Sequence, residues 1–393
     1  MNSNSIFDRP LQFNIMQIIK TKKHQITLTV LVLLLSVGIG FAGTLDVLTY
    51  AIVIVLGLYS ALLILRAPPL GLALLIAGSL LFPLELGTGT ETTLNFTILF
   101  LPVLTGLWFY RYIANRGSLK LAHTRTTLPL LLLIVSVLVA FGFGQFPWFS
   151  IYGNASFSAQ AGGMAIILFS IAAFFLVGNQ VKEIKWLERL TWLFLAIGGA
   201  YIFSRFVPEI ARLSPIQVRQ GATGSLFWTW LVALAFSQSF FNCRLAPILR
   251  IALASVVIGV FSVNLIQDQV WASGWFPPLI TLLVILISGA PRLGGSILLM
   301  GIPLLALNWD RVLSVVLSGD NQYSLVTRLE AWRLLGGIIK INPLFGLGPA
   351  NYYWYTPSSP ILGYSVNFNS HNNYIDLVAQ IGLLGLALSL IHI

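Results

Sequence analysis

The chain has 393 residues, of which 57% are hydrophobic and only 9% are charged. Soluble domains carry about 25% charged residues, so this composition excludes a soluble globular protein and predicts a polytopic membrane protein. The net charge of +10 is compatible with a nucleic-acid partner, but the charges stand singly or in small groups between apolar runs and no nucleic-acid motif is visible. The single cysteine, Cys243, excludes an intrachain disulfide and a thiolate metal cluster.

Residues 1–24 are polar and basic, and we expect them to form a cytoplasmic leader. The apolar run that follows is too long for a secretory signal and is interpreted as a retained first span. At roughly 20 residues per membrane helix, the apolar runs predict about twelve spans, with a bundle over 25–308 and a last, incomplete helix over 373–393. The expected spans are 25–43, 48–65, 69–86, 94–114, 127–144, 163–179, 190–207, 225–241, 250–266, 276–290, 296–308 and 373–393.

Lysine and arginine set the expected orientation. With the N-terminus in the cytoplasm, most of the 22 Lys and Arg residues fall in cytoplasmic segments, in agreement with the positive-inside rule. Residues 309–372 then lie outside the cytoplasm. The cations that remain outside cluster at 205–219 and 311–340, where we expect them to meet an anion; contact with phospholipid headgroups is the alternative.

The segment 309–372 is expected to carry a short amphipathic helix on the outer membrane surface. Thr327 and Glu330 have the spacing of a capping box, which predicts a helix start at Arg328, and Asn342-Pro343 predicts its end. In the first turn Arg328 would meet an anion favoured by the helix dipole, and its guanidinium can bind phosphate in bidentate fashion. A surface plug without a ligand is the alternative. The expected apolar stripe is Leu329, Trp332, Leu335 or Gly336, and Ile339.

His371 stands where a polar, aromatic loop meets the last apolar run. A neutral imidazole at this place can take a proton from a hydroxyl, although an ordinary interfacial histidine is the alternative. Asn372 is expected to cap the last helix or to orient His371. Asp376 lies one turn on, and a carboxylate within a span usually faces a cavity; it would orient His371 or pair with an arginine.

Two motif blocks resemble the signature of the O-antigen ligase and polymerase superfamily, bacterial enzymes that handle glycans carried on polyprenyl diphosphate. One block is His371-Asn372 followed, after nine residues, by Gly382-x-x-Gly385. The other is Arg328-x-x-x-Trp332 together with 342–348, which reads Asn-Pro-Leu-Phe-Gly-Leu-Gly. The stretch 218–224, which contains Arg219, resembles the family's arginine-and-glycine stretch ahead of a middle span. The chain departs from the pattern at 267–271, where many relatives carry a Ser-Arg pair.

The resemblance implies an all-α, GT-C-like glycosyltransferase of the bacterial inner membrane, with its catalytic loop, 309–372, on the extracytoplasmic side. It implies transfer of a polyprenyl-diphosphate-linked glycan to a hydroxyl of a lipid, protein or glycan acceptor in cell-surface polysaccharide assembly. It further implies inversion at the anomeric carbon without a metal or cofactor. His371 would activate the acceptor, with Asn372 and Asp376 in support. The groups implied to hold the diphosphate are Arg328, Arg219 and, as a supporting cation, Arg333.

Further interpretations stay open at this point. The sequence does not separate a ligase from a polymerase. A polyprenol-glycan or solute transporter is the rival of another class, and it predicts charged residues deep in several spans.

Gly382 and Gly385 form a small-x-x-small patch that permits close helix packing. The aromatic run 352–355 would stack on sugar rings or lie in the membrane interface. The last apolar run stops without a polar flank, from which we expect a truncated C-terminus.

Overall fold

The computed structural model describes residues 57–82, 85–87, 93–114, 124–207, 209, 224–267, 272–317 and 320–391. The expected leader, the first expected span and Arg219 lie outside these residues. The chain divides into two compact units, residues 1–67 and 68–393. In the first unit, the structure describes a helix at Gly57–Arg66. All the elements named below belong to the second unit.

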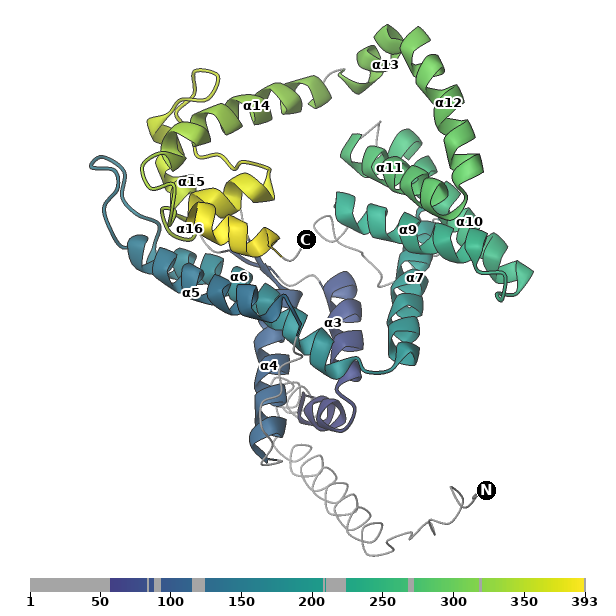
Figure 1. Ribbon diagram of the computed structural model, residues 1–393, viewed down its shortest axis with the longest axis horizontal. Helices are drawn as coiled ribbons and strands as arrows, with labels where there is room; N and C mark the ends of the chain where they lie inside the picture. Colours follow the sequence, from purple (N-terminus) through teal and green to yellow (C-terminus); the bar gives the residue numbers. More distant parts are fainter. Residues whose placement is uncertain are drawn as a thin grey trace, which may run out of the picture. The chain divides into compact units, whose positions relative to one another are not determined.

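The second unit is mostly helical (Figure 1). Helices coincide with the expected spans from 69–86 to 296–308 and with the last one, which confirms the prediction of a helical chain for the described residues. A two-stranded antiparallel ribbon pairs β1 (Glu85–Gly87) with β2 (Thr93–Asn95). The helices are α3 (Pro69–Leu81), α4 (Phe96–Ala114), α5 (Thr127–Phe143), α6 (Phe157–Gln180), α7 (Ile184–Phe206), α9 (Ser225–Phe241), α10 (Pro247–Ser262), α11 (Ala272–Gly289), α12 (Pro291–Leu307), α13 (Trp309–Val316), α14 (Asp320–Ile339), α15 (Asn351–Tyr355) and α16 (Asn373–Leu390).

Four stretches of the described chain are long and apolar enough, by length and composition, to cross a membrane: Phe157–Gln180, Pro247–Ile266, Ala272–Gly289 and Asn373–Leu390. Six further apolar helices have 10–17 residues. Such helices agree with a membrane protein, because a span needs about 20 apolar residues and shorter helices cross only part of the hydrocarbon layer. The count of about twelve spans and their orientation stay predictions.

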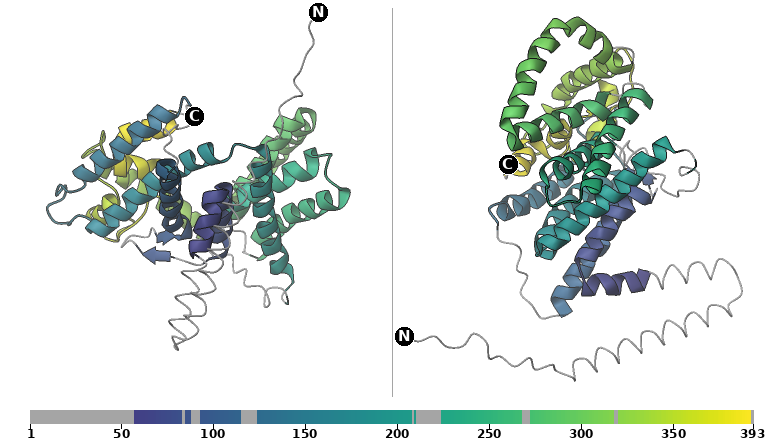
Figure 2. Two further views of the ribbon diagram at one scale, coloured as in Figure 1. Left: turned by 90° about the horizontal axis from the view of Figure 1, so that it is seen from below. Right: turned by 90° about the vertical axis from the view of Figure 1, so that its right-hand side faces the viewer.

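Two groups of helices have separate cores within the second unit. In one, α9 packs against α10 and α11, and α7 packs against α9 and α10. Glycine allows these close approaches: a Cβ added to Gly198 would lie 2.6 Å from a methyl of Leu231, and one added to Gly259 would lie 2.4 Å from Ile202. In the other group, α16 packs against α5 and α14, and α5 packs against α6. Figures 1 and 2 show α16 lying beside α5.

The helix expected to begin at Arg328 begins earlier, at Asp320, so the capping-box prediction is wrong. Thr327 lies inside α14, and its Oγ1 donates a hydrogen bond to the carbonyl of Tyr323 at 2.8 Å. A threonine hydroxyl can bond to the carbonyl four residues before it within a helix, so Thr-x-x-Glu does not require a helix start. The expected end is right, because α14 stops at Ile339 before Asn342-Pro343.

The buried face of α14 differs in part from the expected stripe. Ala331, Leu335 and Ile338 are buried, whereas Leu329 is 53% exposed. Trp332 and Ile339 are partly buried. These buried residues join a core with α15, α16 and the chain between them. The helix therefore supports the loop that leads to His371.

Candidate functional site

The last helix, α16, is interrupted at Gly382, where φ is 72° and ψ is 179°. A break of this kind leaves backbone carbonyls before it and N–H groups after it without partners in the helix. The turn 342–348 supplies partners for four of these groups. The N–H groups of Leu347 and Gly348 donate to the carbonyls of Ala379 and Gln380 at 2.9 and 3.1 Å. In return, the carbonyls of Pro343 and Leu344 accept from Leu383 and Leu384 at 2.8 and 3.3 Å.

Glycines of both motif blocks are required at this contact. A Cβ on Gly382 would lie 2.1 Å from the carbonyl oxygen of Leu344, and a Cβ on Gly346 would lie 2.5 Å from the carbonyl oxygen of Gln380. Both glycines also have positive φ, which costs other residues energy. The expected helix-packing role of Gly382 is therefore wrong, since its missing side chain admits a turn of the chain. A Cβ on Gly385 would first meet only Ile381 of the same helix.

Ser370 is the centre of a polar cluster beside His371. Its carbonyl accepts a hydrogen bond from the indole Nε1 of Trp332 at 2.7 Å. This bond connects the motif block that contains Trp332 to the residue before His371. Its hydroxyl donates to Asp376 Oδ1 at 2.7 Å and accepts from the backbone N–H of Asn372 at 2.9 Å. The hydroxyl of Tyr352 donates to the same oxygen of Asp376. Ser370 is thus bonded directly to residues of α14 and α16, and α15 is connected to it through Asp376.

Asn372 has the first of its two expected roles. Its side-chain oxygen accepts from the backbone N–H of Tyr374 at 3.0 Å, which caps α16. Asp376 contacts neither of its expected partners directly. Its side chain accepts hydrogen bonds from Tyr352 and Ser370, and neither an arginine nor His371 is bonded to it among the described residues. Asp376 is connected to His371 through Ser370, whose hydroxyl donates to Asp376 and whose backbone continues into His371.

His371 itself is exposed and has a left-handed backbone, with φ at 49°. This region is sterically unfavourable for residues other than glycine and persists where the surroundings impose it. The residues on both sides of His371 are held by hydrogen bonds, and Ser370 is 0% exposed. The strained backbone therefore sits between two fixed neighbours.

The tyrosines of α15 have altered acidity. Burial, followed by the charge of Asp376 and the hydrogen bond to it, raises the pKa of Tyr352. Burial raises the pKa of Tyr355 to about 12. Both phenols therefore remain protonated at neutral pH and act as hydrogen-bond donors, Tyr352 to Asp376 and Tyr355 to Asn154 Oδ1 at 2.7 Å.

A fully buried amide joins α15 to the connection between α5 and α6. Asn351 donates to the carbonyl of Gly144 at 2.9 Å and accepts from the backbone N–H of Ala155 at 2.9 Å. Gly144 approaches the motif glycine Gly348 closely, since a Cβ on Gly348 would lie 2.3 Å from the Gly144 Cα. These contacts bring the apolar helices α5 and α6 against the segment that carries His371.

A cavity of about 730 Å³ opens between these two parts, and His371 lies on its wall. The apolar part of the wall comes mainly from α5 and α6, through Leu130, Leu133, Ile166, Ile167, Ile171 and Phe174. The polar part comes from the chain around the motif, through Tyr352, Tyr353, Asn369, His371, Asn373, Asp376 and Gln380. One cavity therefore offers a hydrocarbon-like surface next to hydrogen-bonding groups.

Arg328 does not line the cavity. It precedes Trp332 by four residues, so both side chains lie on one face of α14, and Trp332 donates to the residue before His371. The Nε of Arg328 is buried without a hydrogen-bond partner among the described residues. The expected place in a first turn is wrong, since Arg328 follows Asp320 by more than two turns at 3.6 residues per turn. A helix dipole therefore adds nothing for an anion there.

Arg333 is bound elsewhere. Its guanidinium forms a two-pronged ion pair with Glu330, at 2.9 Å from Nε and 2.6 Å from Nη2, and its side chain is 71% exposed. The hydrogen bond from Arg333 lowers the pKa of Glu330. Arg333 does not line the cavity. The structure thus brings together His371, Asn372 and Asp376, and it leaves Arg333 in its ion pair with Glu330. Arg328 shares a face of α14 with Trp332.

The sequence predicts other roles for two members of the cluster. It favours sugar stacking or an interfacial position for Tyr352, and it predicts a place in an apolar stripe for Trp332. Asp376 is the residue in the sequence that indicates such a polar cluster, because a carboxylate in an apolar helix needs hydrogen-bond donors nearby. The aromatic run 352–355 offers such donors through its tyrosine hydroxyls.

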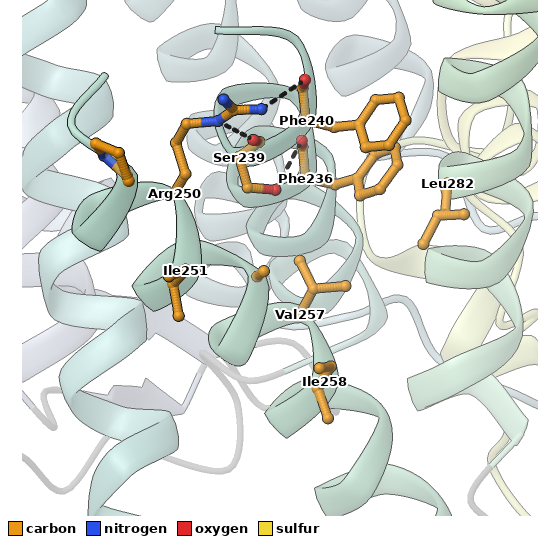
Figure 3. A pocket seen from close by; sticks show the side chains of 10 residues that line it. Phe236, Ser239, Phe240, Arg250, Ile251, Val257, Ile258 and Leu282 are labelled. Atoms are coloured by element: carbon orange, nitrogen blue, oxygen red, sulfur yellow. Dashed lines mark hydrogen bonds between the residues drawn. The ribbon is translucent and has the colours of Figure 1, made fainter. Parts of the chain in front are cut away.

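A second cavity, of about 460 Å³, lies between α9, α10 and α11. Figure 3 shows Arg250 reaching over the end of α9, where it donates to the carbonyls of Ser239 at 2.8 Å and Phe240 at 3.3 Å. A cation that completes the last carbonyls of a helix stabilises its C-terminus. This cavity contains none of the expected site residues.

Comparison with family models, with curated proteins and with solved structures found no match for this chain.

Proposed function

We propose that this chain is a metal-independent, inverting membrane glycosyltransferase of the O-antigen ligase kind, which moves a glycan from polyprenyl diphosphate to an acceptor hydroxyl. The observation that carries the proposal is the cavity in which His371 shares a wall with polar motif residues and faces apolar helices. A lipid-linked glycan combines an apolar chain with a polar head, so a cavity with both kinds of surface suits it. The apolar chain would lie along α5 and α6.

In this proposal His371 is the general base. A neutral imidazole takes the proton of the acceptor hydroxyl as its oxygen bonds to the anomeric carbon. The bond between that carbon and the diphosphate oxygen breaks at the same time, and the diphosphate leaves with the electron pair. Negative charge grows on the diphosphate, so fixed cations near it stabilise the transition state.

Arg328 is the cation best placed for this task. Among the described residues its buried Nε has no hydrogen-bond partner, and an unpaired buried donor costs energy that a phosphate oxygen would offset. Arg219 remains a proposed second contact. Arg333 is a weaker candidate, because Glu330 already occupies two of its donor nitrogens, and it would have to leave that carboxylate to bind the donor.

The proposal places the protein in a bacterial inner membrane, with the cavity open to the extracytoplasmic side. The acceptor would be a lipid, a protein or another lipid-linked glycan, so ligase and polymerase would use the same groups. Complementation of ligase-deficient and polymerase-deficient bacterial strains separates these two uses. A strain restored only by the wild-type chain and not by a His371 variant would support the role of the imidazole.

The direct test is transfer from a labelled polyprenyl-diphosphate oligosaccharide by the purified chain in liposomes. We expect His371→Ala to lower turnover by about 10²–10⁴-fold, the usual contribution of a general base, with donor binding unchanged. Tyr364→Ala is the matched control, because Tyr364 is 69% exposed on the same loop and does not line the cavity. Near-normal turnover of His371→Ala would reject the assignment.

A further inference from the structure

The hydrogen bonds around Ser370 and Asp376 hold the backbone on both sides of His371. We propose that Ser370, Asp376 and Tyr352 are positioning residues, which hold His371 in its left-handed backbone conformation and thereby aim the imidazole into the cavity. The inference rests on the proposed function, since it assigns how the base of that reaction is held. None of the three is proposed to exchange a proton with the substrate.

The backbone on the N-terminal side of His371 is fixed from two helices. Trp332 of α14 donates to the carbonyl of Ser370 at 2.7 Å, which sets the plane of the peptide that joins Ser370 to His371. Asp376 of α16 accepts from the hydroxyl of Ser370 at 2.7 Å. With both its carbonyl and its side chain bonded, Ser370 has no freedom to rotate.

The backbone on the C-terminal side is fixed through the same hydroxyl. Ser370 Oγ accepts from the N–H of Asn372 at 2.9 Å, so the chain folds back over His371. Asn372 is in turn held as the cap of α16. This short turn between Ser370 Oγ and the Asn372 N–H encloses His371, whose φ is 49°.

Tyr352 supports Asp376 in this arrangement. The carboxylate oxygen that holds Ser370 also accepts from the buried phenol of Tyr352, which comes from α15. A carboxylate with two donors on one oxygen is held in one rotamer, and its position controls that of Ser370. The cost of the strained His371 backbone is thus offset by bonds from three separate helices.

Ser370→Ala tests the positioning role most directly, because it removes the hydroxyl that connects Asp376 to Asn372. Misplacing a catalytic group by about 1 Å can cost about 10²-fold in rate, so we expect kcat to fall by about 10–100-fold while KM for the lipid-linked donor is unchanged. Ser370→Thr keeps the hydroxyl and should restore most of the rate. The matched control is Thr356→Val, because Thr356 is also 0% exposed and its hydroxyl also bonds to backbone groups of the same loop.

A second measurement is independent of activity. The rate at which diethyl pyrocarbonate modifies His371, followed by mass spectrometry, reports the environment of the imidazole. We expect Ser370→Ala to change this rate beyond the spread of wild type and Thr356→Val. A changed modification rate in a chain without transferase activity would reject the proposed function and keep the positioning role.

Three results would overturn the positioning role. They are equal losses of kcat in Ser370→Ala and Thr356→Val, a rise in KM without a fall in kcat, and an unchanged modification rate of His371. If Ser370→Ala does not fold, Tyr352→Phe replaces it, since the ring still fills its place while one bond to Asp376 is lost. The same two measurements then apply, with a smaller expected loss of kcat.

Discussion

Replacing Gly382 by alanine is the most informative perturbation of this fold, because it acts where the two motif blocks meet. The added Cβ would lie 2.1 Å from the carbonyl oxygen of Leu344, and the neighbouring atoms are also backbone atoms that cannot rotate away. The backbone at Gly382, with φ at 72° and ψ at 179°, also lies in a region that only glycine adopts readily.

The size of the effect follows from two contributions. Forcing a residue with a side chain into that backbone region costs about 1–3 kcal/mol. Moving the turn away breaks the bonds from Leu383 and Leu384 to the turn carbonyls, at about 0.5–1.5 kcal/mol each. We therefore expect Gly382→Ala to destabilise the chain by about 2–6 kcal/mol.

The assay is thermal unfolding of the purified chain in detergent, at one scan rate because many proteins unfold irreversibly and their apparent unfolding temperature then depends on the scan rate. Gly337→Ala is the control, since an added Cβ at this position in α14 meets nothing within 4 Å. Replacing glycine by alanine inside a helix stabilises it by about 1 kcal/mol, so the two variants should move the unfolding temperature in opposite directions. An unfolding temperature for Gly382→Ala at or above that of wild type would refute the interlocked arrangement.

Three further outcomes are expected. Arg328→Lys should weaken binding of the lipid-linked donor by at least about tenfold in a binding assay, because charge-assisted hydrogen bonds are worth about 1.5–3 kcal/mol and lysine lacks the guanidinium fork; unchanged affinity would place the diphosphate elsewhere. His371→Gly should unfold at a higher temperature than His371→Ala, since alanine pays about 1–2 kcal/mol for a left-handed backbone that glycine adopts freely; equal temperatures would mean that the backbone there is unstrained. The raised pKa of Tyr352 means that its phenol ionises near pH 10 only in the unfolded chain, so stability should fall as pH rises above about 10, and Tyr352→Phe should lose less stability than wild type over that range.

The helix positions could be predicted because long apolar runs are visible in the sequence without any tertiary information. The runs that form α5, α9 and α11 are of this kind. The end of α14 was equally visible, because proline at 343 restricts the residue before it. The start of α14 was not, since Thr327 can bond backward inside a helix as easily as it can cap one.

The candidate site was predictable only in its parts. His371, Asn372 and Asp376 follow one another on the chain, so their proximity needed no fold. The contact of Trp332 with Ser370 joins residues from different helices, and the pairing of Tyr352 with Asp376 does the same. No local pattern reports such pairings, because hydrophobic periodicity describes one helix at a time.

The contact at Gly382 explains why the two motif blocks act as one structural unit. A broken helix needs partners for the backbone groups on both sides of the break, and the turn 342–348 provides them within the same few residues. That turn follows α14 directly, so Trp332 is carried to the residue before His371 as a consequence of the same docking. Any change that releases the turn from α16 should therefore also release the backbone of His371, which links the stability of the fold to the geometry of the proposed base.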